Sequence, residues 1–251
     1  MPNMVGLSQA LQECAHNMAS HPVIMSPSDA QGGQPPKTLV STTYLALRKD
    51  IIQGRLAPGS KLRAEHLKDV YNVGAGTLRE ALSLLASDAL VVIQGQRGFR
   101  VAAMSPSDFH DITETRIVLE CQALRLSIHV GDDEWECTLT AAFHRLNLVE
   151  QRFRANRNEM FEEWESANKG FHEVLISRCG SPWTQHFLKV LYNQAERYRR
   201  VLLPNRPESR DVHAEHEAIF SATMARNEDA ACDLLSSHIR YNLELYKKLD
   251  G

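Results

Sequence analysis

The chain has 251 residues, 43% of them hydrophobic and 24% charged, an ordinary composition for a globular protein of one large or two small domains. No stretch approaches the ~18 consecutive apolar residues of a membrane helix, and the first residues lack the pattern of a secretory signal. The five cysteines are scattered and form no CxxC pair, which favours reduced thiols over a disulfide framework or a zinc finger. We therefore expect a cytoplasmic protein without a membrane partner.

The net charge of −3 is unevenly distributed along the chain. Residues 38–103 carry nine lysines and arginines against five acidic residues, whereas residues 104–251 carry 18 against 24. A small basic domain joined to a larger acidic one is typical of a DNA-binding protein with a second domain that does not bind DNA. Ordinary charge variation between domains would give the same difference.

The N-terminal residues 1–37 show no strong periodicity and end in SPSDAQGGQPPK. Paired glycines and paired prolines oppose both helix and strand, so we predict a flexible extension. From Thr43 onward, apolar residues recur at helical spacing until Gly54, which is placed to end a helix. Pro58-Gly59 then marks a turn.

Residues 62–101 have the pattern of a winged helix-turn-helix within a predicted domain at 38–103. A short helix at 64–71 is expected to direct Leu67 and Val70 inward, and the glycines of NVGAG are expected to form the turn. Thr77 is predicted to cap the second helix. Strands at 90–93 and 99–102 would form the wing. The second helix carries an apolar stripe made of Leu78, Ala81, Leu82 and Leu85.

Polar residues near the start of the second helix are placed as in a recognition helix in the major groove. Arg79 could contact a guanine or a phosphate, although a solvated arginine paired with Glu80 or Glu65 is the alternative. Arg97 at the wing tip suits the minor groove or a phosphate. The residues predicted to contact a double-stranded DNA operator are Arg63, Thr77, Arg79, Arg97, Gly98 and Arg100.

Residues 104–251 read as almost entirely helical, without strand alternation or internal repeats. Ser105 is a good N-cap and Pro106 suits the first helical position. The predicted helices span 107–130, 133–154, 158–179, 183–203, 208–225 and 228–248. Short connections between them predict an antiparallel bundle of six to seven helices, and a mostly α fold for the whole chain.

Three segments, IIQGRLAPGSKL, TLREAL and GQRGFRV, resemble the DNA-binding domain of the GntR family of bacterial transcription regulators over about residues 40–103. Most members have Ser-Arg where this chain has Gly74-Ala75, so the resemblance implies that one DNA-contacting arginine is absent and that the operator sequence differs. The subgroup that resembles the carbon-starvation-induced operon repressor shows a similar replacement by small residues.

Four further segments, TRIVLE, NKGFHEVL, EHEAIFSA and HI, resemble the all-helical effector (FCD) domain of the FadR subfamily over about residues 105–245. The resemblance implies a metal site with Asn168, His172, His216 and His238 as ligands. It also implies that Arg116 binds the carboxylate of an effector, whereas an i,i+4 ion pair with Glu120 is the alternative.

The predicted ligand set is chemically consistent with a divalent metal. Asn168 and His172 are four residues apart and share one helix face. Three imidazoles suit zinc or nickel, and their spacing does not choose between these ions. Many members have aspartate at the position of Asn168, and a neutral amide would leave the metal's double charge free to attract an anionic effector. Buried or surface histidines without a metal are the alternative.

We therefore expect a homodimeric transcription regulator, a repressor, controlled by a small carboxylate effector. One alternative is a metalloenzyme, although His216-Glu217 is followed by Phe220 where an HExxH protease needs its second histidine. A second alternative is a metal-free bundle that serves only for dimerisation.

Overall fold

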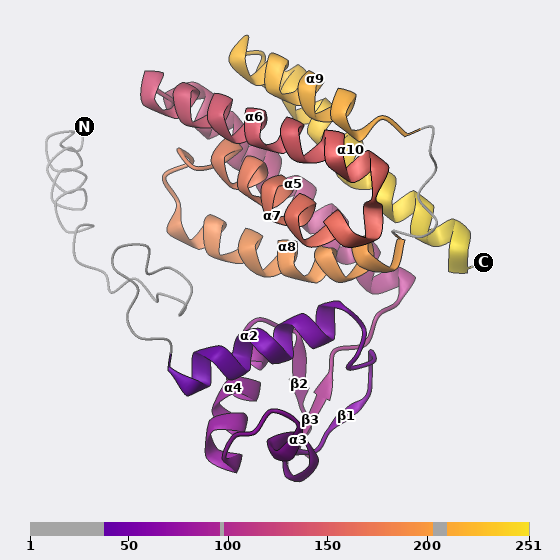
Figure 1. Ribbon diagram of the computed structural model, residues 1–251. Helices are drawn as coiled ribbons and strands as arrows, with labels where there is room; N and C mark the ends of the chain where they lie inside the picture. Colours follow the sequence, from indigo (N-terminus) through magenta and orange to yellow (C-terminus); the bar gives the residue numbers. More distant parts are fainter. Residues whose placement is uncertain (1–37, 96–97, 203–209, 251) are drawn as a thin grey trace, which may run out of the picture. The chain divides into compact units, whose positions relative to one another are not determined.

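The computed structural model describes residues 38–95, 98–202 and 210–250, so the predicted extension at 1–37 and Arg97 lie outside the described residues (Figure 1). Within them the chain is mostly helical, with one three-stranded sheet in its N-terminal part and a helical bundle after it. This confirms the predicted fold class. None of the described helices is long and apolar enough to cross a membrane.

Three helices of the N-terminal part share one core. Helix α2 (Leu39–Ile52) begins at Thr38, whose hydroxyl accepts a hydrogen bond from the backbone N–H of Ser41 at 3.1 Å. Helices α3 (Ala64–Val70) and α4 (Ala75–Ser87) follow. The predicted apolar stripe of α4 is completely buried against α2 and the sheet, which confirms that face as the core of this part.

The sheet has the order β1-β3-β2 and is antiparallel throughout. Strands β2 (Val91–Ile93) and β3 (Phe99–Val101) form the predicted wing. Strand β1 (Lys61–Leu62) was not predicted, because two residues are too few to show an alternating pattern. Its Leu62 pairs with Phe99 and is 4% exposed, so β1 closes the core beneath the wing.

Three local predictions in the helix-turn-helix are wrong. Helix α4 begins at Ala75 with Gly74 as its N-cap, so Thr77 lies in the first turn and is not the cap. The left-handed residue of the turn is Asn72, with φ 51°, because an asparagine tolerates this conformation, and neither glycine of NVGAG adopts it. Val70 is 73% exposed, because the residues of α3 that pack against the core are Ala64 and Leu67.

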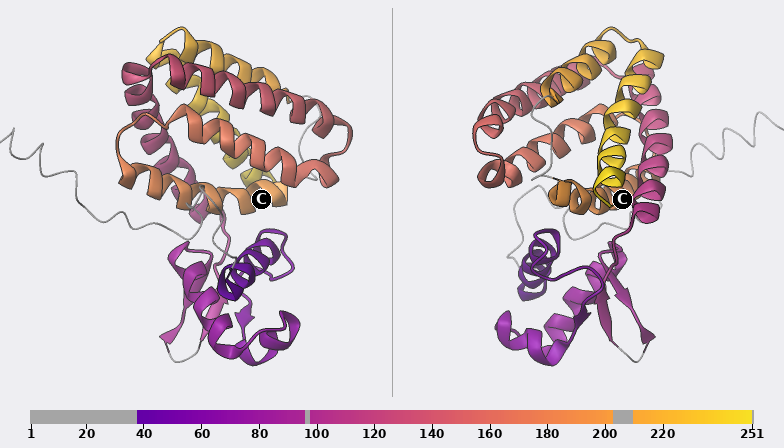
Figure 2. Two further views of the ribbon diagram at one scale, coloured as in Figure 1. Left: turned by 60° about the vertical axis from the view of Figure 1, so that its left-hand side comes forward. Right: turned by 90° about the vertical axis from the view of Figure 1, so that its right-hand side faces the viewer.

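The bundle contains six described helices: α5 (Pro106–Val130), α6 (Asp133–Ala155), α7 (Arg157–Leu175), α8 (Pro182–Leu202), α9 (Val212–Met224) and α10 (Glu228–Asp250). Helix α10 packs against α5, α8 and α9, while α6 packs against α7 and α9 (Figures 1 and 2). Ser105 caps α5 as predicted, since its hydroxyl accepts from the N–H of Asp108 at 3.1 Å. Helix α7 ends four residues before the predicted 179, where a turn leads to Gly180 at φ +70°.

Candidate metal and effector site, and the DNA-binding surface

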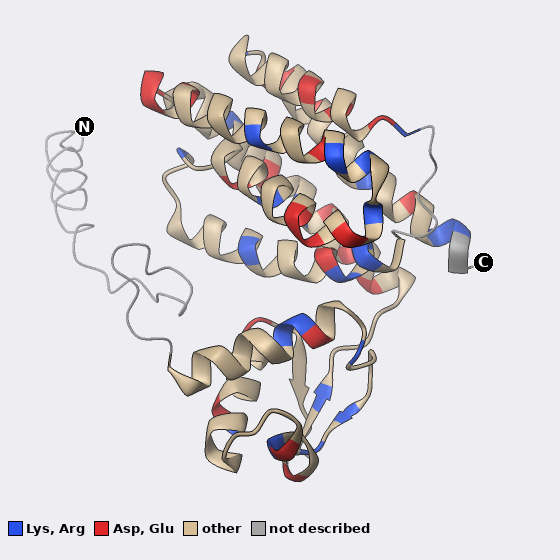
Figure 3. Ribbon diagram, in the orientation of Figure 1, with Lys and Arg blue, Asp and Glu red and all other residues tan. Residues whose placement is uncertain are grey.

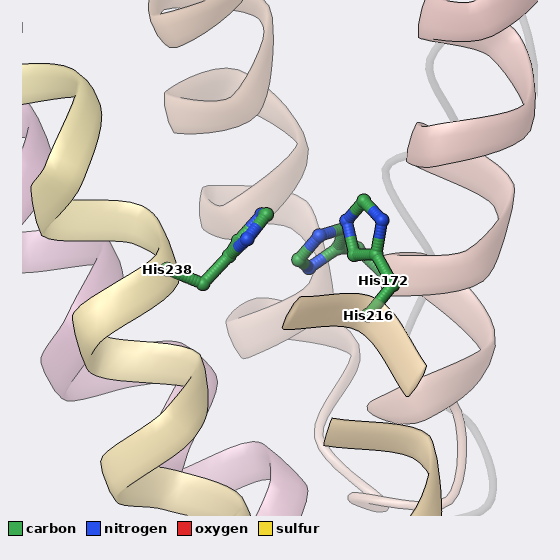
Figure 4. Close-up of side chains that lie close together, drawn as sticks. All are labelled: His172, His216 and His238. Carbon is green, nitrogen blue, oxygen red and sulfur yellow. The ribbon is translucent and has the colours of Figure 1, made fainter. Parts of the chain in front are cut away.

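Three histidines from three helices meet inside the bundle. His172 comes from α7, His216 from α9 and His238 from α10, and their rings converge in Figure 4. One nitrogen of each ring lies within 4.8 Å of those of the other two. The side chains are 4%, 0% and 9% exposed. Sequence spacing alone cannot show such convergence; the packing of α7, α9 and α10 produces it.

Glutamates fix the protonation of two of these rings. The Nδ1–H of His216 donates to Glu150 Oε1 at 2.8 Å, and the Nδ1–H of His238 donates to Glu215 Oε2 at 2.7 Å. A carboxylate only accepts hydrogen bonds, so Nδ1 of each ring carries a proton, and Nε2 holds the lone pair when the ring is neutral. His216 Nε2 is buried and has no hydrogen-bond partner. Carboxylate–histidine pairs of this kind orient the imidazoles that bind metals in proteins.

The third ring has a carboxylate beside it as well. His172 Nδ1 lies 3.5 Å from Glu120 Oε2, and neither atom has a hydrogen-bond partner. Burial would raise the pKa of Glu120, but Arg116 and His172 lower it to about 2. Burial also lowers the pKa of His172 and of His238. These two rings are therefore neutral at pH 7, which is the form that binds a metal.

The amide of Asn168 completes the set. Its Nδ2–H donates to the hydroxyl of Tyr192 at 2.6 Å, which leaves Oδ1 buried without a partner. A buried polar atom without a partner costs about 1–3 kcal/mol, so Asn168 Oδ1 and His216 Nε2 together are unusual in a folded protein. An amide oxygen and imidazole nitrogens are suitable ligands for a divalent metal, which would satisfy them. The residues present thus fit such an ion.

A small cavity of about 10 Å³ adjoins His172 and His238. Its lining residues are Arg116, Trp164, Asn168, His172, Arg199, Arg210, Val212, His238, Ile239 and Asn242. Arg116 lines this cavity and also donates from Nε to Glu120 at 2.7 Å, so the effector role and the i,i+4 ion pair are compatible. Its guanidinium lies 5.0 Å from the centre of the Tyr192 ring.

Two further arginines of the cavity were not predicted from the sequence. Arg199 pairs with the buried carboxylate of Glu165, and its guanidinium lies 4.3 Å from the centre of the Tyr192 ring. Arg210 binds both oxygens of Glu215 at 2.8 Å. The sequence did contain one indication of a buried arginine. Glu165 falls on the buried face of α7 between aromatic residues, and a buried acid there needs a cation as its partner.

His213 is not one of the three histidines whose ring nitrogens converge. Its Nδ1 lies 3.0 Å from the second oxygen of Glu150, so it shares that carboxylate with His216. His213 therefore helps to hold the glutamate that orients a predicted ligand.

The predicted DNA-contacting residues lie on the helix-turn-helix and wing. Arg79 is exposed on α4, Thr77 is half-buried two residues nearer the start of α4, and Arg63 is exposed at the start of α3. Gly98 has φ +86°, a conformation that favours glycine at the wing turn. Basic residues occupy both β1 and β3 (Figure 3). Arg100 differs from the other predicted DNA-contacting residues because its side chain is hydrogen-bonded within the protein.

The guanidinium of Arg100 is already used within the wing. It donates from Nη1 to the backbone carbonyl of Gly59 at 2.7 Å and from Nε to Gln94 Oε1 at 2.9 Å. These bonds tie β3 to the turn before β1 and to the end of β2. A contact of Arg100 with DNA would use only its remaining donors.

Comparison with known proteins agrees with the two parts of the chain. Residues 39–101 match the model of the bacterial regulatory proteins of the gntR family, and residues 111–241 match the FCD domain. The chain belongs to the GntR family of bacterial transcription regulators, in the branch with an FCD domain. It is therefore a DNA-binding regulator, which confirms the predicted class of protein.

Individual relatives are regulators as well. The HTH-type transcriptional regulator BphR of Paraburkholderia xenovorans is 47% identical over 213 residues, 84% of this chain and 86% of BphR. The HTH-type transcriptional repressor GlaR of Escherichia coli is 34% identical over 200 residues, 78% and 90% of the two chains. Among solved structures, E. coli McbR/YncC shares the fold with a TM-score of 0.69 at 17% identity, covering 85% of this chain and 99% of that one.

Proposed function

We propose that this regulator is a homodimeric repressor whose operator binding is controlled by a small carboxylate effector in a metal-containing bundle. One observation carries the proposal: three buried histidines converge, and two of them line a cavity that three arginines also line. The relative GlaR is named a transcriptional repressor, which supports repression rather than activation by this protein. The symmetry of most operators supports a dimer, because two winged helices then bind two half-sites.

The metal would be held by Asn168, His172, His216 and His238. Imidazoles from three helices favour zinc or nickel. The ion would supply a fixed double positive charge that attracts a carboxylate. Glu150 and Glu215 orient their histidines for this role.

The charges around the cavity make the metal necessary for a carboxylate to bind. Arg116, Arg199 and Arg210 each form an ion pair with a glutamate of their own. Glu150 adds a fourth carboxylate beside His216. Four glutamates exceed three arginines, so the site without an ion is net negative and repels an anion. A divalent ion reverses this sign.

Helix α8 offers a route from the cavity to the DNA-binding part. Arg199 lines the cavity and Tyr192 bonds to Asn168, which also lines it, while several residues between them contact the DNA-binding part. Arg48 of α2 donates to Asn193 at 3.1 Å and also pairs with Glu196. A small shift of α8 on effector binding would therefore act directly on α2.

A second contact of α8 reaches the end of the recognition helix. The side-chain amide of Gln194 donates to the backbone carbonyl of Asp88, the C-cap residue of α4, at 2.9 Å. Arg197 of the same helix donates to the carbonyl of Ala102, at the end of the wing. These contacts support α8 as the helix that connects the effector site with the helix-turn-helix and wing.

Metal analysis of the purified protein tests the centre. We expect about one zinc or nickel ion per chain in the wild type by plasma mass spectrometry, and its loss in His216→Ala. The control is His144→Ala, because His144 is exposed on α6 and should leave the metal content unchanged. Equal metal in both variants, or none in the wild type after loading, would overturn the metal assignment.

Calorimetric titration tests the effector. We expect small mono- and dicarboxylates to bind the metal-loaded protein, and binding to vanish after chelation. The matching uncharged amides are the control ligands, since they share size and shape but lack the charge. Equal affinity for the amides would refute a carboxylate effector.

A further inference from the structure

Two cysteines face each other between α5 and α10, apart from the site described above. The thiol of Cys121 donates to the backbone carbonyl of Cys232 at 3.6 Å, and the thiol of Cys232 donates to the carbonyl of Cys121 at 3.5 Å. This reciprocal arrangement places both sulfurs in the narrow space between the helices. The hydroxyl of Ser236 lies 3.3 Å from Cys121 Sγ, so small side chains let the two backbones approach closely.

Ion pairs on either side hold the register of this helix pair. Arg125 of α5 binds Asp229 of α10 at 2.6 Å, and Arg240 of α10 binds Glu114 of α5 at 2.8 Å. The cysteine pair lies between these two contacts along both antiparallel helices. These ion pairs are consistent with the helix alignment that places each sulfur within 3.6 Å of the other residue's carbonyl oxygen.

The two thiols differ in reactivity. Cys121 is half-buried, whereas Cys232 is only 3% exposed. Hydrogen bonding with Cys232 lowers the pKa of Cys121 to about 7, against the opposing effect of burial. The same contact raises the pKa of Cys232. Cys121 is therefore the more accessible thiol, which a peroxide can reach first, and Cys232 is a buried thiol held next to it.

We propose that Cys121 and Cys232 form a reversible intramolecular disulfide when a hydroperoxide oxidises the protein. The Cys121 thiolate attacks the peroxide, the O–O bond breaks, and a sulfenic acid forms with release of one water or alcohol after protonation. Cys232 Sγ then attacks Cys121 Sγ, the S–O bond breaks, and a second water leaves with the thiol proton. The peroxide is reduced by two electrons, and two thiols become one disulfide.

Because of its position, this disulfide would make the geometry of the cavity depend on the redox state of the two cysteines. Glu120, which pairs with Arg116, directly precedes Cys121 on α5, and His238 lies on α10 beyond Cys232. A covalent link would fix these two helices against each other beside the site. The disulfide itself does not depend on the proposed metal or effector.

Differential alkylation of the full-length protein tests the proposal. The metal-free protein is treated with hydrogen peroxide, its remaining thiols are alkylated, and tryptic peptides are examined by mass spectrometry. We expect a linked Cys121–Cys232 peptide, about 2 Da lighter than the two reduced peptides together, that disappears with dithiothreitol. Cys137, which is exposed on α6, is the internal control and should remain alkylatable.

Serine variants assign the two steps. Cys232→Ser should stop at a sulfenic acid on Cys121 that dimedone traps, and Cys121→Ser should show no oxidation of Cys232. The variant in which Cys14, Cys137 and Cys179 are all replaced by serine should form the disulfide as the wild type does. A Cys121 that proceeds to sulfinic acid while Cys232 stays a free thiol would overturn the proposal, and so would a disulfide between chains.

Discussion

Substitution of Glu150 gives the most specific test of the proposed metal centre. Its carboxylate accepts hydrogen bonds from His216 at 2.8 Å and from His213 at 3.0 Å, and it is 4% exposed. In Glu150→Gln the side chain keeps its size but loses its charge. Its amide nitrogen can then donate to His216 Nδ1, which would move the ring proton to Nε2 and block the lone pair that faces the cluster.

The expected loss follows from these contacts. Charge-assisted hydrogen bonds are roughly twice as strong as neutral ones, so the glutamine orients the ring less firmly even when its oxygen is the acceptor. Replacing an outer carboxylate partner of a metal-binding histidine costs about 10- to 100-fold in metal affinity. We therefore expect zinc binding to weaken by about 1.4–2.7 kcal/mol, with the fold intact.

Competition with a chromophoric chelator measures this change directly. The matched control is Glu217→Gln, because Glu217 is an exposed neighbour of His216 on α9 and should bind zinc as the wild type does. Circular dichroism shows whether the variants keep their helices. If Glu150→Gln bound zinc within about twofold of the wild type, the inferred role of Glu150 in orienting His216 would be refuted.

Four other substitutions test the DNA-binding surface, the contact of α2 with α8, and the packing of the bundle. Arg79→Ala should weaken operator binding in anisotropy titrations by about 1–3 kcal/mol and reduce the salt slope by about 1. Arg48→Ala should leave effector binding unchanged in calorimetry but reduce its effect on DNA affinity, a coupling of typically about 5- to 150-fold. Gly131→Ala should destabilise the fold in urea by about 1–3 kcal/mol, because a Cβ would lie 2.1 Å from the buried Trp135 ring. Gly170→Ala should stabilise it by about 0.5–1 kcal/mol, since a Cβ there contacts nothing within 4 Å.

The helices of the bundle could be predicted from the sequence because caps and breaks punctuate them. Ser105 and Pro106 marked the start of α5, and Gly131-Asp132 marked its end, where the structure places it. The end of α7 was predicted too late, since Ile176 and Cys179 continue the apolar spacing through a turn. Periodicity reports which residues are buried, and a buried turn looks like more helix.

The site was less predictable, because its carboxylates are recognisable only in three dimensions. Glu150 lies on the buried face of α6, four residues after Leu146 and three before Phe153. An acid within an apolar stripe is a sign that something inside the protein partners it. The sequence cannot name that partner, since His216 lies 66 residues away and is brought close only by the packing of α6 against α9.

The amide at position 168 sets the balance between holding the metal and attracting the effector. With Asn168 the proposed divalent ion leaves one net positive charge among three arginines and four glutamates, whereas an aspartate would cancel it. Asn168→Asp should therefore bind zinc more tightly and carboxylates more weakly, two opposite shifts from one isosteric change. Tyr192 would keep its bond by donating to the carboxylate, so packing is preserved. Chelator competition and calorimetry on the same sample measure both shifts. If both affinities moved in the same direction, position 168 would not act through charge.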